Sequence, residues 1–170
     1  MSNPLSLELP DEAATTRLGR LLALVLSERL ADIAEQGFNL RLDGDLGAGK
    51  TALVRALLRG LGVTGPVKSP TFALVEPYKV SRLDFYHFDF YRFADPEEFA
   101  SAGFREMFGP ACITASEWSE RAGPRLPAAD LRIALAPEGE GRRATISADS
   151  PIGKACLSAL TISWNSPDAV

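Results

Sequence analysis

A glycine-rich stretch, GDLGAGKT, occupies residues 44–51 and satisfies the pattern GxxxxGK[ST] completely. Glycine lets the backbone wrap so closely that its N–H groups face phosphate oxygens, where a Cβ would clash or forbid the dihedrals. A following helix would add its positive N-terminal end, Lys50 a point charge, and Thr51 a hydroxyl for magnesium. The stretch therefore predicts a site for a nucleotide with Mg²⁺, formed by Gly44, Asp45, Leu46, Gly47, Ala48, Gly49, Lys50 and Thr51.

Glu117 is the first candidate for the carboxylate that a magnesium nucleotide site also needs. It stands at the end of an apolar run, in the segment ACITASEW at residues 111–118. A carboxylate at the end of such a strand can hold magnesium directly or through water. The alternative is an exposed glutamate at the mouth of a loop, and position alone does not decide between the two.

Asp89 is the second candidate, in the aromatic segment YHFDFYRF at residues 86–93. If this segment is a strand, alternation places His87 and Asp89 on one face, and both faces carry apolar bulk. A covered carboxylate is costly unless a cation, a metal or hydrogen bonds compensate it. The alternative to a site residue is an ion pair with Arg92 or another cation, although Arg92 would point to the opposite face. For His87 we favour a hydrogen-bonded histidine that holds its neighbours in place.

Composition narrows the classes of protein. The net charge of −4 argues against a protein whose own surface binds nucleic acid electrostatically. A single histidine excludes a metal site built from several imidazoles. Two distant cysteines encode neither a disulfide framework nor a zinc site. A GTPase should carry NKxD and DxxG motifs, which do not occur in the sequence. A small-molecule kinase and a nucleotide-gated binding module that does not hydrolyse ATP remain open alternatives.

Periodicity and turn residues predict a single α/β domain, a three-layer P-loop NTPase fold with a mixed sheet that includes an antiparallel hairpin. We expect this domain over residues 1–160 and a flexible tail over 161–170. The expected helices are 11–36, 51–61, a short one from 95, and 153–160; the expected strands are 6–10, 38–42, 72–78, 83–91, 111–115, 131–135 and 143–147. The apolar run at 21–26 is too short to span a bilayer and no signal peptide precedes it, so we expect a cytoplasmic protein without a membrane partner.

Four motifs follow one another between Gly44 and Trp118, namely GDLGAGKT, VKSPTFALVEPY, YHFDFYR and SEW. In this combination the sequence resembles the TsaE family, also called YjeE, the small ATPase of bacterial tRNA threonylcarbamoyladenosine synthesis. The resemblance implies an ATPase with ATP and Mg²⁺ that binds and regulates the TsaB and TsaD proteins. Those subunits carry out the threonylcarbamoyl transfer, so tRNA would be reached only indirectly, through the complex.

The resemblance also implies roles for individual residues. Lys50 and Thr51 match the phosphate and magnesium residues, and Glu117 the magnesium carboxylate. Asp89 matches an aspartate at the nucleotide, which we expect to orient the attacking water. Further matches are Trp118 near the nucleotide, a switch-like loop of Ser69, Pro70 and Thr71, an N-terminal contact at Glu12 or Thr15, and a late-hairpin contact at Gly141 with Arg142. Plain core packing is the alternative for Trp118, as surface placement is for the N-terminal and late-hairpin residues.

Overall fold

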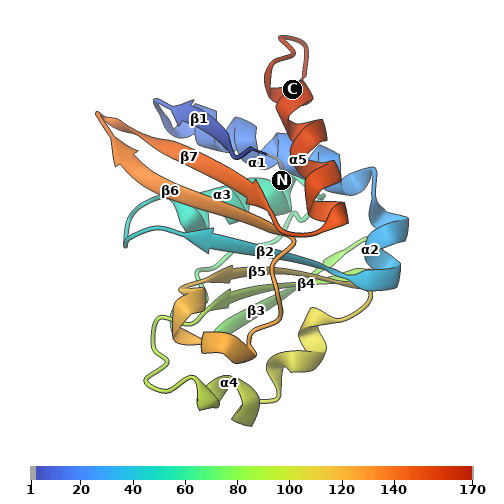
Figure 1. The fold of residues 1–170 in the computed structure, drawn as a ribbon, viewed down its shortest axis with the longest axis vertical. Coiled ribbons are helices and arrows are strands. Elements are labelled where there is room, and N and C mark those ends of the chain that lie inside the picture. Colours follow the sequence, from blue (N-terminus) through green and yellow to red (C-terminus); the bar gives the residue numbers. More distant parts are fainter. Residues whose placement is uncertain (1–2, 170) are drawn as a thin grey trace.

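The computed structural model describes residues 3–169, which build one mixed sheet of seven strands with helices on both faces (Figure 1). The strands are β1 (Leu5–Leu9), β2 (Phe38–Asp43), β3 (Val75–Val80), β4 (Leu83–Asp89), β5 (Cys112–Glu117), β6 (Leu131–Glu138) and β7 (Gly141–Ala148). Their order across the sheet is β1-β7-β6-β2-β5-β4-β3. The four central strands are parallel and the outer strands pair antiparallel. The expected mixed α/β sheet with a β3–β4 hairpin is confirmed.

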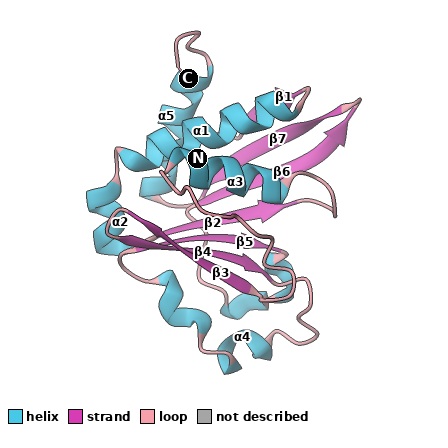
Figure 2. Cartoon of the chain, turned by 180° about the vertical axis from the view of Figure 1, so that it is seen from behind, coloured by secondary structure: helices cyan, strands magenta, loops and turns pink. Residues whose placement is uncertain are grey.

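Three helices cover one face of this sheet, and Figure 2 shows two of them, α1 (Glu12–Ser27) and α3 (Lys50–Gly60), side by side across it. The third is α5 (Pro151–Trp164), which packs on α1 and on β7. A Cβ on Gly19 would lie 2.4 Å from the Cβ of Ala56, so a glycine in α1 permits the close approach of α3. This contact holds α3, the helix that follows the glycine-rich loop, against α1.

An aromatic cluster covers the other face over β4 and β5. Its buried members are Phe88, Phe90, Phe93, Phe99, Phe108, Ala122 and Leu126. Phe88 lies on β4, Phe99 on α4 (Glu97–Ser101) and Phe108 on η1 (Phe104–Phe108). The others lie in the loop after β4 and on either side of η3 (Gly123–Arg125), which follows η2 (Ser119–Arg121). Phe85, in contrast, belongs to the main core cluster, which also contains the buried residues of α1 and α3. The two faces of β4 are therefore both covered, as the alternation in its sequence predicts.

The single long helix expected over residues 11–36 is wrong. The chain forms α1 and a separate helix, α2 (Leu30–Gln36), with a break at Glu28 and Arg29. The side chain of Arg29 donates a hydrogen bond to the carbonyl oxygen of Val25 over 2.8 Å. A carbonyl in the last turn of α1 thus finds a side-chain partner, which favours an end at this point. Apolar periodicity continues across the break because both helices face the same core.

Other expected boundaries also differ, and the strand expected over residues 83–91 ends at Asp89. The strand expected from Phe72 begins at Val75, because Leu74 takes a positive φ of 67° and its N–H bonds back to the carbonyl oxygen of Pro70. The last helix runs past Leu160 to Trp164, whose ring lies 4.4 Å from the Arg17 guanidinium. This contact ties the end of the helix to α1. The flexibility of the tail stays a prediction, and its last residue, like residues 1 and 2 of the expected domain, lies outside the described range.

Between residues 3 and 169, no helix combines the length and the apolar character that crossing a membrane requires.

Candidate nucleotide site

The loop between β2 and α3 is the glycine-rich stretch. Gly44, Gly47 and Gly49 have φ values of 148°, 79° and 105°, a region that side chains with a Cβ rarely adopt. A Cβ on Gly49 would lie 1.8 Å from Nη1 of Arg142, and one on Gly44 would lie 2.7 Å from the carbonyl oxygen of Leu135. The loop therefore needs glycine for its conformation and for its neighbours, and it opens into the N-terminus of α3 at Lys50.

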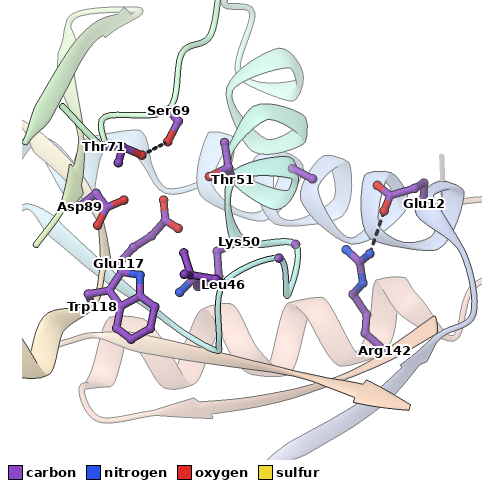
Figure 3. Close-up of a pocket in the computed structure, with 13 residues that line it drawn as sticks. Glu12, Leu46, Lys50, Thr51, Ser69, Thr71, Asp89, Glu117, Trp118 and Arg142 are labelled. Carbon is purple, nitrogen blue, oxygen red and sulfur yellow. Dashed lines mark hydrogen bonds and ion pairs between the residues drawn. The ribbon is translucent and has the colours of Figure 1, made fainter. Parts of the chain in front are cut away.

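A pocket of about 250 Å³ lies over this loop (Figure 3). Side chains from distant parts of the chain meet in it, with Asp89, Glu117 and Trp118 on one side of Lys50 and Glu12 with Arg142 on the other. Its lining residues are Glu12, Leu46, Gly47, Gly49, Lys50, Thr51, Ala52, Ser69, Thr71, Asp89, Glu117, Trp118 and Arg142. The pocket has an acidic end, a central loop and an end occupied by an ion pair.

Asp89 and Glu117 form the acidic end. They lie directly opposite each other at the carboxyl ends of the parallel strands β4 and β5, and their residues are only 7% and 3% exposed. Burial raises the pKa of Asp89, the N–H of Tyr91 lowers it by donating over 2.9 Å, and the charge of Glu117 raises it further. Arg92 is not its partner, because that guanidinium lies 4.2 Å over the ring of Phe72. The alternative of an ion pair between Asp89 and Arg92 is therefore excluded, in agreement with the opposite facing predicted for Arg92.

Glu117 is not an exposed glutamate at a loop mouth. Its Oε2 lies 2.5 Å from Nε2 of His87, and both side chains are buried. The predicted hydrogen-bonded histidine in a hairpin strand is confirmed, with Glu117 as its partner. No group of three or more His, Cys, Asp or Glu side chains that could enclose a metal occurs among the described residues. One or two carboxylates beside a phosphate site fit Mg²⁺, which is usually held by few protein ligands together with substrate phosphates.

Lys50 is buried in the centre of the pocket. Its ammonium group donates to the carbonyl oxygen of Gly44 and lies 4.2 Å from the centroid of the Trp118 ring. Trp118 directly follows β5 with a positive φ of 56°, and its ring meets Tyr91 edge to face at 5.0 Å. The side chain of Trp118 therefore borders the pocket, so plain core filling does not describe it.

Arg142 and Glu12 close the other end. Nη2 of Arg142 donates to Oε1 of Glu12 over 2.7 Å, whereas its buried Nη1 has no partner among the described residues. The neighbouring Gly141 does not line the pocket, because it packs so tightly on β1 that a Cβ would lie 2.4 Å from the carbonyl oxygen of Leu9. Thr15 is buried outside the pocket. Of the two late-hairpin residues named from the sequence, Arg142 therefore lines the pocket and Gly141 does not.

The remaining predicted residues divide between the pocket and its surroundings. Ser69 and Thr71 line the pocket and their hydroxyls lie 2.7 Å apart, whereas Pro70 is buried and outside the lining. Ala48 is also buried outside the lining. Gly44 and Asp45 face a second hollow on the other side of the loop. Sequence reasoning missed Ala52, although its place directly after Thr51 in the first turn of α3 was available as a signal.

The family model for the threonylcarbamoyl adenosine biosynthesis protein TsaE matches residues 9–145 of the chain. A protein of Haemophilus influenzae described as tRNA threonylcarbamoyladenosine biosynthesis protein TsaE is 40% identical over 153 residues, 90% of this chain and 95% of its own. A protein of Synechocystis with the same description is 42% identical over 132 residues, 74% and 76% of the two chains. The crystal structure of YdiB from Bacillus subtilis matches with a TM-score of 0.76 and 26% identity, over 97% of this chain and 99% of that one.

Proposed function

The chain belongs to the TsaE family of threonylcarbamoyl adenosine biosynthesis proteins, and from this premise we propose that it serves tRNA threonylcarbamoyladenosine formation as an ATPase. In this proposal it binds ATP with Mg²⁺ at residues 44–51 and hydrolyses it to ADP and phosphate. It acts in the cytoplasm on the TsaB–TsaD complex and does not carry out the threonylcarbamoyl transfer itself.

One observation carries the proposal, namely that Lys50, Thr51, Asp89 and Glu117 converge on a single pocket from three separate segments. A loop that only bound phosphate would need no pair of buried carboxylates at its edge. Two acids at the ends of adjacent strands carry a desolvation cost, which a cation at this place would offset. The pair therefore favours a metal-assisted phosphate reaction over simple anion binding.

Each group has a proposed role in that reaction. Thr51 and Glu117 would hold Mg²⁺, which would neutralise charge on the phosphates when bound. Lys50 contacts the β and γ phosphates after leaving the Gly44 carbonyl. Asp89 orients the attacking water, because phosphoryl transfer depends mainly on positioning and on charge stabilisation. Ser69 and Thr71 lie at the same end of the pocket as Asp89, where a loop could respond to the γ-phosphate.

The ion pair of Glu12 and Arg142 is the proposed boundary of the nucleoside end. This pair lies on the other side of Lys50 from the acidic end, so a nucleotide whose phosphates lie over Lys50 would extend towards it. Ala52 also lines the pocket. The contact expected at Gly141 with Arg142 is proposed here for Arg142 alone, whose Nη1 has no partner within the described residues. Gly141 supports this end by letting β7 approach β1 closely.

Tryptophan fluorescence should report nucleotide binding. The chain has two tryptophans, so a Trp164→Phe variant keeps Trp118 as its only emitter. Adding ATP with Mg²⁺ is expected to change the Trp118 emission, because phosphates draw the Lys50 ammonium away from the ring that it now contacts. The converse variant, Trp118→Phe, should show little response. An unchanged Trp118 signal while calorimetry shows binding would contradict the proposed displacement of Lys50.

Reconstitution tests the function itself. The purified protein, combined with TsaB, TsaD, ATP and tRNA, is expected to support more than one turnover of tRNA modification, with ATP hydrolysed as modification proceeds. The measurement is modified tRNA per complex against time, together with released phosphate. A phosphorylated small acceptor would instead identify a kinase. Equal turnover with a non-hydrolysable ATP analogue would identify a nucleotide-gated binding module and refute the proposed ATPase.

A further inference from the structure

His87 is the fully buried neighbour of the acidic end, and the proposed function leaves it without a role. We propose that His87 is a positioning residue, which orients the Glu117 carboxylate so that one of its oxygens is presented to Mg²⁺. The proposal rests on the proposed function in one respect, that a magnesium nucleotide binds in the pocket. It assigns no contact between His87 and the nucleotide.

The register of the sheet creates this contact. His87 pairs with Ala115 across the parallel strands β4 and β5, which places Glu117 two residues further along β5. Oε2 of Glu117 lies 2.5 Å from Nε2 of His87, and among residues 3–169 no hydrogen bond reaches Oε1. One carboxylate oxygen is thus held from behind by the imidazole. The other oxygen has no such bond among the described residues, and Glu117 lines the pocket.

The two ring nitrogens of His87 have different surroundings. Nδ1 is buried and, within the described part of the chain, has no hydrogen-bond partner. A proton on Nδ1 would therefore be a buried donor without an acceptor, whereas a proton on Nε2 is donated to the carboxylate. The geometry assigns the neutral tautomer that carries its proton on Nε2. Histidine is suited to this task because a rigid ring fixes the direction of the N–H that it donates.

Magnesium titration separates orientation of Glu117 from general support of the sheet. In a Trp164→Phe background, the affinity for ATP is measured by fluorescence and calorimetry, once with EDTA and once over a range of Mg²⁺ concentrations. His87→Leu is expected to lower the apparent affinity for Mg²⁺ about 10- to 100-fold, the usual effect of losing a residue that supports a metal ligand. Its affinity for ATP with EDTA should stay close to that of the parent. His87→Gln, which places an amide N–H near the position of Nε2, should recover part of the loss.

Thr114→Val is the matched control. Thr114 is equally buried, lies on β5 and donates to Oδ1 of Asn39, away from the pocket. The Thr114→Val variant should have a lower midpoint of thermal unfolding but the same apparent affinity for Mg²⁺ as the parent. Parent-like Mg²⁺ dependence in folded His87→Leu would overturn the proposal, as would an equal loss of affinity with and without Mg²⁺. If the leucine variant does not fold, His87→Gln is compared with His87→Ala. A glutamine variant that binds Mg²⁺ no better than the alanine variant would refute a donor role for His87.

Nitrogen NMR gives a second readout. Because the chain has a single histidine, ¹⁵N-histidine labelling yields the signals of one imidazole. We expect a protonated Nε2 and an unprotonated Nδ1, with the Nε2 signal shifting when Mg²⁺ is added to the nucleotide complex. A proton on Nδ1 alone would overturn the proposal. A parent that binds magnesium nucleotide without hydrolysing it would refute the ATPase, yet a selective loss in His87→Leu would still support His87.

Discussion

Replacing Lys50 by methionine is expected to lower ATP turnover at least about 100-fold, the scale seen when one group that stabilises the charge of a transition state is removed. Methionine keeps most of the length and volume of lysine but carries no ammonium group. Lys50 is the cation that lies within the pocket beside the two buried carboxylates, and α3 holds it at the end of the glycine-rich loop. Among residues 3–169 the other cation that lines the pocket is Arg142, and its Nη2 is engaged by Glu12 at the opposite end.

The measurement is phosphate release at saturating ATP, with TsaB and TsaD present, together with ATP affinity by calorimetry. Lys154→Met serves as the matched control, because it removes an exposed lysine on α5 that does not line the pocket. This control should keep the turnover of the parent. A Lys50→Met protein with parent turnover would exclude the pocket as the site of hydrolysis.

Replacing Asp89 by asparagine is expected to have the second largest effect, a fall in turnover of about 100-fold or more when the water is no longer oriented. Asparagine keeps the shape and the oxygen that accepts the N–H of Tyr91, so the loop after β4 should stay in place. The removed charge is the one that burial and Glu117 already make costly. Folding should therefore persist while hydrolysis is lost, and ATP binding should change much less than turnover.

The decisive measurement is the number of tRNA modifications that each reconstituted complex completes. Asp89→Asn should stop near a single turnover, whereas the parent continues. Asp84→Asn is the control on the same strand, since Asp84 pairs with Lys79 at the surface and lies outside the pocket. Multiple turnovers at the parent rate with Asp89→Asn or Asp89→Ala would remove Asp89 from the reaction and leave it a structural role.

The two effects differ in what they would mean for the carboxylate pair. Loss of hydrolysis in both variants would support one pocket in which cation and acid act on the same phosphates. Loss of hydrolysis with Lys50→Met alone would support phosphate binding in the pocket. Asp89 would then have only a structural role at the end of its strand. Glu117 would then remain the only acid with a proposed contact to magnesium, and His87 would keep its role through Glu117.

The glycine-rich loop and the class of the fold could be predicted from the sequence because their determinants are local. A loop of eight consecutive residues carries its own glycines, its lysine and its hydroxyl, and the strand before it and helix after it are encoded next to it. Alternation along β4 likewise predicts two covered faces, since side chains on a strand point to opposite sides by geometry alone. Two boundaries were predicted wrongly from periodicity. Near Glu28 a hydrogen bond from the Arg29 side chain favours the end of α1, and at Leu74 a turn hydrogen bond delays the start of β3.

The contacts between distant segments could not be predicted in this way. That Asp89 lies opposite Glu117, and that His87 reaches the same carboxylate, depends on the register of two parallel strands joined by a long connection. Arg142 enters the pocket because β7 pairs with β1 and so brings the hairpin beside Glu12. The sequence by itself determined a phosphate-binding loop and the acids available to it, because those are properties of short segments. Only the tertiary structure decided that Asp89, Glu117, Arg142 and the single histidine come together there, because strand register and helix packing are set by the burial of the whole core.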